Sequence, residues 1–481
     1  MRSIPPVTKL AAALGATLAL SGCADGWSRP ALGIDAPARW KDDRGARAVW
    51  PAADWWRGFG SSELTSLIQT AERENQDIDA AKARIEQADA QVRINGASLI
   101  PFLQATGDTQ LQKSSGPGAR AVGGFQTAAS ASYELDFWGR NRATVRSAQA
   151  SAVSARFAEE VVALGVVTSV ANTYFALMAA QERLAIAHSN VRSAQTIFDA
   201  IQARLDVGTA NALDRAQQRS VLDQQKATIP EIEQEIRTNE TAIALLLGRP
   251  PVRVDIKGGR LASLRTPKVA PGIPAAVLAR RPDVREAEAN LAATDNDVTS
   301  ARAAFLPAIN LTAQGGFESV ALRSLFGSQS TFYSLGAGLT QPLLDASLPG
   351  NLDLATGRYR ENLIAYRRAA VQSFVDVENA LIAVRKTAEQ ERLQQAAVKS
   401  AREAYDIVQA QLREGAVDVT TVLAVQQTLF SAQDQLVAVR LARFQASVSL
   451  FEALGGGWAA SGKPAGGDPL VLAKSVGGAA K

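Results

Sequence analysis

The chain has 481 residues but only one cysteine, one histidine and two methionines. A single cysteine excludes disulfide bonds within the chain. His188 stands alone, so there is no Cys/His cluster for a zinc site, and Met1 and Met178 do not make a soft-metal relay. No phosphate-binding glycine loop occurs, and Gly455–Gly457 is better explained as the end of a helix. We therefore predict a protein that is not an enzyme and uses no metal and no cofactor.

Two further absences concern membranes and nucleic acids. Beyond residue 22 the sequence contains no run of about 18 apolar residues, the length that a transmembrane helix needs. The formal net charge is only +4, so neither a nucleic acid nor an acidic substrate is suggested as a partner.

The first 22 residues have the features of a secretory signal peptide. Arg2 and Lys9 provide its positive charge, and its apolar core is too short to span a bilayer. The segment ends in Leu20-Ser21-Gly22-Cys23, which resembles the processing box of bacterial lipoproteins. We predict that residues 1–22 are removed and that Cys23 carries a lipid anchor, since several acyl chains on one residue attach stably. The alternative is a chance cysteine in an ordinary signal peptide.

Residues 23–60 are predicted to form an extended, lipidated arm. Five of the seven tryptophans lie between Trp27 and Trp56, in a stretch with no regular periodicity. We expect this arm to attach itself to the rest of the chain through these side chains.

Residues 99–113 and 123–138 alternate between apolar and polar side chains, which predicts two strands. Leu103 and Leu111, for example, alternate with Gln104 and Gln110. The polar positions carry Gln, Ser and Thr rather than Lys and Glu, which suits a water-filled lumen, while the apolar positions suit lipid. A soluble hairpin with one solvated face is the alternative for one such pair. Residues 306–318 and 331–344 show the same pattern, with a loop between them.

The same order of elements occurs twice in the chain. Seven residues recur at an offset of 206: Asp77, Ala81, Asp89, Val92, Ala97, Pro101 and Thr106 return as Asp283, Ala287, Asp295, Val298, Ala303, Pro307 and Thr312. Two glycines, Gly208 and Gly248, return as Gly415 and Gly455 at an offset of 207. We predict a first repeat at 61–250 and a second at 274–458, with a linker at 251–273 that runs outside the helices. Residues 459–481 are predicted to be a flexible tail.

Each repeat contains a helix of unusual length. Residues 140–207 contain no proline and one glycine, Gly165, and their apolar residues recur at three- and four-residue steps. Such a helix would be roughly 100 Å long. We predict long hairpins at 140–247, with a kink at Pro230, and at 350–454. Shorter helices at 61–96 and 274–303 precede the strands and supply the length that the return helices lack.

Four strands cannot close a barrel, and open sheet edges are not tolerated in lipid. Several copies must therefore pool their strands. Two copies would give eight strands with a nearly filled interior, and three would give twelve strands around a lumen. The predicted fold class is mainly α with a membrane β-barrel part. Each protomer has a duplicated strand pair plus a long helical hairpin, and twelve strands above continuous helices describe a tunnel across the periplasm.

The sequence resembles the TolC-type outer membrane efflux channels, specifically the lipoprotein branch that serves resistance-nodulation-division pumps. The resemblance covers about residues 20 to 458. It rests on these residues: Cys23, Trp55, Trp56, Phe59, Leu64, Asn75, Pro101, Tyr133–Arg140 (YELDFWGR), Val207–Thr209, Arg280–Val284 (RRPDV), Pro307 and Gly415–Asp418.

The resemblance implies a homotrimer of the outer membrane with a twelve-stranded barrel and a twelve-helix tunnel. It implies a passive exit duct for drugs or other small molecules that opens at its periplasmic tips when an adaptor and an inner-membrane pump dock. The predicted docking residues are Val207, Gly208, Thr209, Glu414, Gly415 and Ala416. No residue pattern identifies the exported compound.

The gate is where this sequence departs from the family. Related channels commonly carry acidic residues just past the second tip, where this chain has Thr421 and Ala424. The charged residues near the tips form our candidate gate instead: Arg204, Asp206, Asp214, Arg215, Arg413 and Asp418. Solvated turn residues, and an apolar constriction at Val422 or Leu423, are the alternatives.

Two alternatives to an efflux channel each explain part of the sequence. A lipid-anchored periplasmic adaptor also uses coiled-coil hairpins, but it would need one hairpin flanked by soluble β-domains. A purely structural helical lipoprotein would leave the duplicated strands unexplained.

Overall fold

The computed structural model describes residues 33–41, 50–113, 121–267 and 274–456. Cys23 and the predicted tail lie outside these ranges, as do residues 114–120 between the first two predicted strands. Within them the chain forms two compact units. The strand unit contains Ile85–Ala155 and Ala287–Arg368, and the helical unit contains Ala36–Arg84, Arg156–Glu286 and Ala369–Lys481.

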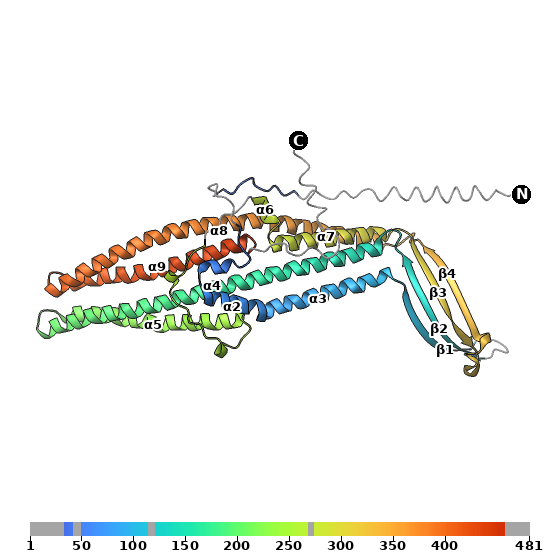
Figure 1. Cartoon of the computed structure of the whole chain (residues 1–481), viewed down its shortest axis with the longest axis horizontal. Coiled ribbons are helices and arrows are strands. Elements are labelled where there is room, and N and C mark those ends of the chain that lie inside the picture. Colours follow the sequence, from blue (N-terminus) through green and yellow to red (C-terminus); the bar gives the residue numbers. More distant parts are fainter. Residues whose placement is uncertain (1–32, 42–49, 114–120, 268–273, 457–481) are drawn as a thin grey trace. The chain divides into compact units, whose positions relative to one another are not determined.

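The strand unit is built on one antiparallel sheet with the strand order β1-β2-β3-β4 (Figure 1). Its strands are β1 (Phe102–Lys113), β2 (Ala121–Leu135), β3 (Ala308–Ser319) and β4 (Thr331–Thr340). The alternating pattern predicted all four, but β1 begins at Phe102 rather than at 99, β2 ends at Leu135 rather than at 138, and β4 ends at Thr340 rather than at 344. β4 ends before Pro342, because proline has no N–H to continue the ladder.

Helices continue directly from the sheet. In the strand unit, α7 (Pro282–Ala303) packs against α8 (Ser347–Glu414) through one buried cluster. Leu291 and Val298 of α7 meet Tyr359 and Leu363 of α8 in that cluster. The start of α8 lies three residues before the predicted Gly350, because Asp345 accepts hydrogen bonds from the backbone N–H and the hydroxyl of Ser347.

The helical unit consists mainly of two hairpins. α4 (Arg140–Asp206) returns as α5 (Ala212–Leu246), and α8 returns as α9 (Val419–Ala453) (Figure 1). The long helices have 67 and 68 residues, and each return helix has 35. α5 continues as one helix through Pro230.

One predicted helix is in fact two. The sequence predicted a single helix at 61–96, but the structure has α2 (Ser62–Glu74) and α3 (Gln76–Gly96) with Asn75 between them. Ser61 caps α2 by accepting a hydrogen bond from the N–H of Leu64, as the sequence indicated. Asn75 is extended, and its side-chain oxygen accepts from the N–H groups of Asp77 and Ile78, so it ends one helix and caps the next.

The second repeat has a break at the corresponding place. α6 (Pro274–Leu278) ends before Arg281, and α7 begins at Pro282. Proline at the first helical position is favourable, while the residue before it is pushed out of the helical conformation. The predicted helix at 274–303 is therefore also divided.

The largest apolar core of the helical unit contains seven aromatic side chains in mutual contact. Trp55 stacks on Phe451 with ring centroids 4.6 Å apart, and Phe59 meets Phe175 at 4.9 Å. Trp40 is also buried, in a separate cluster with Val277 and Val377. The described part of the tryptophan-rich arm is thus held by its aromatic side chains, which bury much apolar area.

Two ion clusters join the hairpins. Arg183 of α4 donates to Glu235 of α5 and Asp434 of α9, both at 2.7 Å. Arg440 of α9 donates to Glu182 of α4 at 2.9 Å and to Glu391 of α8 at 3.2 Å. The Glu182 and Glu391 side chains are only 9% and 10% exposed. Glu391 also pairs with Arg443 at 2.6 Å, so losing Arg440 would leave the buried Glu182 carboxylate unpaired. These contacts fix how the two hairpins lie against each other.

Candidate functional site: the two-faced sheet and the hairpin tips

The register of the sheet places most large apolar residues of the four strands on the same face, whereas Phe102 and Phe332 lie on the other, mainly polar face. Leu103 lies opposite Ala131, which lies opposite Ala313, which lies opposite Leu335. Large side chains on this face are Leu103, Leu111, Phe125, Tyr133, Leu135, Ile309, Leu311, Phe317, Tyr333, Leu335 and Leu339. Because opposite residues of an antiparallel pair share a face, the four separate alternations combine into one apolar surface.

The other face of the sheet is polar. Its side chains include Gln104, Thr106, Asp108, Gln110, Gln126, Ser130, Ser132, Glu134, Asn310, Thr312, Gln314, Glu318, Ser334 and Thr340. Much of the apolar face is uncovered within the described chain, since Leu111 is 78% exposed and Leu335 is 81% exposed. A water-soluble protein would not leave so many large apolar side chains uncovered on one surface. This sheet is suited to lipid on one side and water on the other.

Aromatic side chains mark the junction between β2 and α4. Phe137 and Trp138 are 69% and 44% exposed, and their rings meet edge to face at 4.8 Å. The indole N–H of Trp138 donates to the carbonyl oxygen of Pro307 at 2.8 Å, which fixes the ring beside the start of β3. Exposed aromatic side chains at the end of a strand are typical of the water interface of a membrane.

Both hairpins turn in the same way at their tips. Gly208 and Gly415 each have a φ of +76°, a backbone conformation that residues other than glycine adopt only at an energetic cost. The N–H of Thr209 donates to the carbonyl of Arg204, and the N–H of Ala416 donates to that of Gln411. This is the hydrogen-bond pattern of a glycine-terminated helix. The predicted docking residues are exposed, with Val207 at 73%.

The six charged residues of the candidate gate lie at these tips but form no ion pair with one another within the described chain. Asp418 caps α9 by accepting from the N–H of Thr421 at 2.7 Å, and this hydrogen bond lowers the pKa of Asp418. Asp214 accepts from the backbone of Asn211, and Asp206 accepts from Gln202. Arg204 reaches the other hairpin, where it donates to the carbonyl of Leu412 at 3.2 Å. Within one chain, therefore, Asp214 and Asp418 bind the backbone of their own helix ends, and Asp206 binds the side chain of Gln202 one turn away.

The tips are held together by an apolar cluster that lies just behind them. Ile201 of α4, Leu412 of α8 and Val422 of α9 belong to this cluster. Val422 is fully buried in it, so the alternative of an apolar constriction formed by Val422 is wrong. Gln218 of α5 lies deeper along the hairpin, where it is fully buried and donates to the carbonyl of Ala194 at 2.9 Å.

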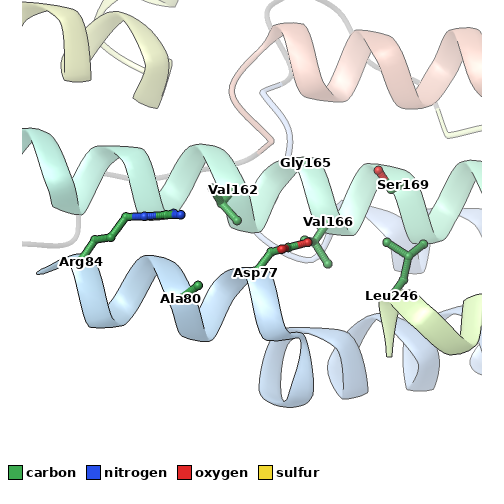
Figure 2. Close-up of a pocket in the computed structure, with 8 residues that line it drawn as sticks. All are labelled: Asp77, Ala80, Arg84, Val162, Gly165, Val166, Ser169 and Leu246. Carbon is green, nitrogen blue, oxygen red and sulfur yellow. The ribbon is translucent and has the colours of Figure 1, made fainter. Parts of the chain in front are cut away.

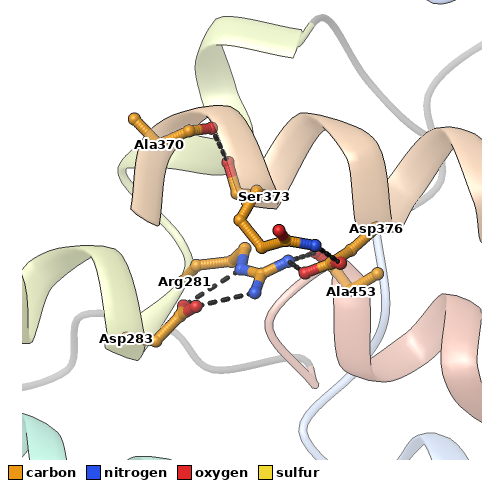
Figure 3. A network of polar contacts seen from close by, with 7 residues as sticks. Arg281, Asp283, Ala370, Ser373, Asp376 and Ala453 are labelled. Atoms are coloured by element: carbon orange, nitrogen blue, oxygen red, sulfur yellow. Dashed lines mark hydrogen bonds and ion pairs between the residues drawn. The ribbon is translucent and has the colours of Figure 1, made fainter. Parts of the chain in front are cut away.

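Where α6 ends, Arg281 forms a polar network that the sequence analysis did not anticipate (Figure 3). Its guanidinium donates to both carboxylate oxygens of Asp283 at 3.0 and 2.6 Å, and to Asp376 of α8 at 2.9 Å. Gln372 donates to the other oxygen of Asp376 at 2.7 Å. Burial lowers the pKa of Arg281, but its two carboxylate partners outweigh this and raise it. The RRPDV stretch carried the signal, but its partners in α8 lie 95 residues away.

One helix of the described chain, α4, is long and apolar enough by length and composition to cross a membrane. Half of the apolar window is buried inside the chain, as expected for a core helix. A single helix of this kind is weak evidence for a membrane span. The described residues contain no group of three His, Cys, Asp or Glu side chains that could hold a metal ion.

A sheet suited to lipid on one face and to water on the other, together with two long helical hairpins, defines a class of protein: the subunit of a membrane channel. The family model described as Outer membrane efflux protein matches residues 67–249 and 273–456. The chain belongs to this family. It is an efflux channel of the outer membrane, and the adaptor alternative is not supported.

Individual relatives agree with this assignment. The pyoverdine export outer membrane protein OpmQ of Pseudomonas putida is 37% identical over 90% of this chain and 94% of its own length. The cation efflux system protein CusC of Escherichia coli is 28% identical over 92% of this chain and 97% of its own. The open-state structure of the Neisseria gonorrhoeae MtrE outer membrane channel superposes with a TM-score of 0.82 at 25% identity, over 90% of this chain and 97% of that one.

Proposed function

We propose that three copies of this chain form a passive exit duct with one continuous twelve-stranded barrel. The observation that carries this proposal is the open four-stranded sheet with one apolar and one polar face. β1 and β4 each have only one neighbouring strand, so both edges carry unpaired backbone groups. Such edges are costly in lipid, and pairing β4 of one copy with β1 of the next removes them. Three copies leave a water-filled lumen, whereas two would not.

The test is the state of the protein in the outer membrane. Purified outer membrane from cells that make the chain should yield a trimer that survives cold detergent and dissociates on heating. Epitope tags inserted between Ser319 and Ser330 should be detected on intact cells, because this segment joins β3 to β4. A protein that stays monomeric in the outer membrane would contradict the proposal.

The hairpin tips are proposed as the surface that an adaptor and an inner-membrane pump engage. Val207, Gly208 and Thr209 of the first tip, and Glu414, Gly415 and Ala416 of the second, are exposed and mostly small. Small residues at a glycine turn let another hairpin tip approach closely. Replacing Thr209 or Ala416 with Trp should abolish export and leave the trimer intact, since neither side chain is buried.

The gate is proposed to be electrostatic and to lie between copies. The carboxylates of Asp214 and Asp418 each accept a hydrogen bond from the backbone at the start of their own helix, but each can still accept hydrogen bonds from a second partner. Arg215 and Arg413 make no ion pair within the described chain, so they are available to a neighbouring copy. Exposed pairs contribute little individually, but threefold symmetry repeats each of them. Adaptor contacts would then overturn a modest preference for the closed state.

Cys23 is proposed as the lipid anchor, on the evidence of its position after the signal peptide. Labelled palmitate should enter the natural chain but not a Cys23→Ser variant. Equal labelling of both would exclude this residue. The variant should still form some trimer, because the barrel inserts independently of the lipid.

The proposed cargo is a siderophore. OpmQ, which is 37% identical, is named for pyoverdine export, whereas the cation efflux relative CusC is only 28% identical. The scarcity of methionine and histidine gives no support to a metal-ion path. A strain lacking the gene should secrete less siderophore and retain it in the periplasm. Normal secretion together with lost tolerance of a metal cation would favour a cation instead.

A further inference from the structure

The Arg281 network has a counterpart in the first repeat, and the comparison shows what the first repeat lacks. At offsets of 206 and 207, Arg281 corresponds to Asn75, Asp376 to Ser169, and Gln372 to Gly165. Asp283 alone is retained, as Asp77. The hydrogen bond to the end of the return helix is also retained: Asn75 donates to the carbonyl of Leu246 at 2.8 Å, and Arg281 donates to that of Ala453 at 3.4 Å.

The three smaller residues leave a hollow of about 420 Å³ (Figure 2). α3 contributes Asp77 and Arg84 to its lining, α4 contributes Gly165, Val166 and Ser169, and the end of α5 contributes Leu246. A Cβ atom added at Gly165 would meet nothing within 4 Å. The hollow therefore lies where the second repeat holds a guanidinium group and the Gln372 side chain.

The carboxylate of Asp77 makes no hydrogen bond or ion pair with any residue that the structure describes. Its equivalent, Asp283, binds the Arg281 guanidinium through both oxygens. The amide of Asn75 cannot do this, because its oxygen caps α3 and its nitrogen is bound to Leu246. The first repeat thus keeps the acceptor of the ion pair and the space for the donor, but not the donor.

We infer that this hollow binds an arginine side chain presented by the periplasmic adaptor. This inference rests on the proposed function. The guanidinium would pair with Asp77, and its aliphatic stem would lie along Val166 and Leu246. Arg84 lies two helical turns from Asp77, about 10 Å along α3, and forms no ion pair within the described chain. It offers an acidic residue of the same adaptor segment a second contact.

An external donor suits a partner that binds reversibly. An arginine at position 75 would fill the hollow permanently, as Arg281 fills its counterpart, without the entropic cost of ordering a separate chain. A donor on a second copy of this chain would be just as permanent. Leaving the site open also makes the two repeats different at an otherwise similar place. An adaptor whose arginine binds in the hollow would therefore bind the first repeat and not the second at this place.

The test fills the hollow with a side chain of the channel itself. Gly165→Gln adds the side chain that the second repeat has at this position, in a helix that tolerates glutamine better than glycine. The matched control is Gly357→Gln, at an exposed glycine of α8 that is also helical and also has no atom within 4 Å of an added Cβ. Binding of each full-length, detergent-purified channel to its purified cognate adaptor is measured, together with trimer content and export.

We expect Gly165→Gln and Asp77→Asn each to weaken adaptor binding about tenfold, the loss expected for one desolvated charged hydrogen bond. Gly357→Gln should bind within about twofold of the natural chain. When the adaptor arginine that occupies the hollow is replaced with alanine, Asp77→Asn should no longer change adaptor binding. Unchanged adaptor binding by Gly165→Gln overturns the inference. Loss of the trimer in Gly165→Gln alone also overturns it, because a second copy would then be the occupant.

These outcomes are separable from failure of the proposed function. If the natural chain forms no trimer or binds no adaptor, the exit-duct proposal fails. If the natural chain trimerises, binds and exports, and Gly165→Gln does the same, only the arginine site fails.

Discussion

At the end of α5 the backbone of Gly248 lies against the carbonyl of Glu74, and at the end of α9 Gly455 lies against that of Arg280. Both glycines have positive φ angles, and a Cβ atom on either would overlap the facing oxygen. A few residues away the side chains differ, with Asn75 and a hollow in one repeat and Arg281 paired with Asp283 and Asp376 in the other. Backbone contacts that only glycine allows were kept in both copies, while side-chain packing diverged. The predictions below test this difference from the largest effect to the smallest.

The glycine contacts should be equally important in both repeats. Gly248→Ala and Gly455→Ala should each cost about 3 kcal/mol or more, because the strain of a positive φ adds to a clash with backbone that cannot move aside. Gly60→Ala is the matched control, since Gly60 has a φ of +79° but no atom within 4 Å of an added Cβ. It should cost about 1 kcal/mol. Thermal unfolding of the purified channel measures all three, and a control loss as large as the others would contradict the role of the close contact.

The polar networks should be unequal. Arg281→Ala should cost about 2 to 3 kcal/mol, because it leaves Asp283 and Asp376 close together without their shared cation; both are about one-third exposed, so the loss stays below that of a fully buried pair. Asn75→Ala should cost about 1 kcal/mol for the lost cap. Chemical denaturation at neutral pH gives both values. Equal losses would mean that the two sites are equivalent after all.

The apolar face of the sheet should behave alike in both repeats. Leu103→Lys in β1 and Ile309→Lys in β3 should each lower the stability of the folded trimer by about 1 to 2 kcal/mol. The cost stays in this range because both positions lie near the start of a strand rather than at mid-membrane. Gln104→Lys and Asn310→Lys, on the polar face, should have little effect. Heat-modifiable trimer from outer membranes is the measurement. Equal losses on both faces would refute the assignment of one face to lipid.

The helix caps at the tips should differ in their response to acid. Asn211 caps α5 with a neutral amide, whereas Asp418 caps α9 with a carboxylate whose pKa is lowered by the N–H of Thr421. A lowered pKa in the folded state means stability that is present above the ordinary pKa of aspartate and lost as the pH falls below about 3.8. Asp418→Asn should keep the cap and abolish this small acid dependence, measured by unfolding between pH 3 and pH 7.

The same variant tests the proposed gate. If Asp418 helps to close the channel, Asp418→Asn should raise single-channel conductance while the trimer stays as stable as before. Asp418→Ala removes the cap as well as the charge, so a conductance change in that variant alone would identify a structural effect. Unchanged conductance in both would remove Asp418 from the gate.

Much of this fold could be predicted from local sequence patterns. The alternation in each strand, the glycines at the tips and the cap at Ser61 all act over a few residues. The divisions at Asn75 and Arg281 were missed, although asparagine followed by acids and arginine followed by proline are recognisable helix boundaries. The capping roles of Asp214 and Asp418 do not follow from their charge, because they depend on hydrogen bonds between each carboxylate and the backbone of its own helix end.

The sequence by itself determined the family, the duplication, the two-faced strands and the positions of the turns, because each depends on periodicity or on residue types with distinct backbone preferences. Only the tertiary structure decided that Val422 packs inside the chain, that Arg281 pairs with Asp376, and that Asp77, beside Gly165, has no partner among the described residues. These features depend on which side chains of separate helices come within a few ångströms of one another. Residues such as Asp77 and Asp283 are identical in sequence, and only their neighbours, distant along the chain, make one a filled ion pair and the other an open site.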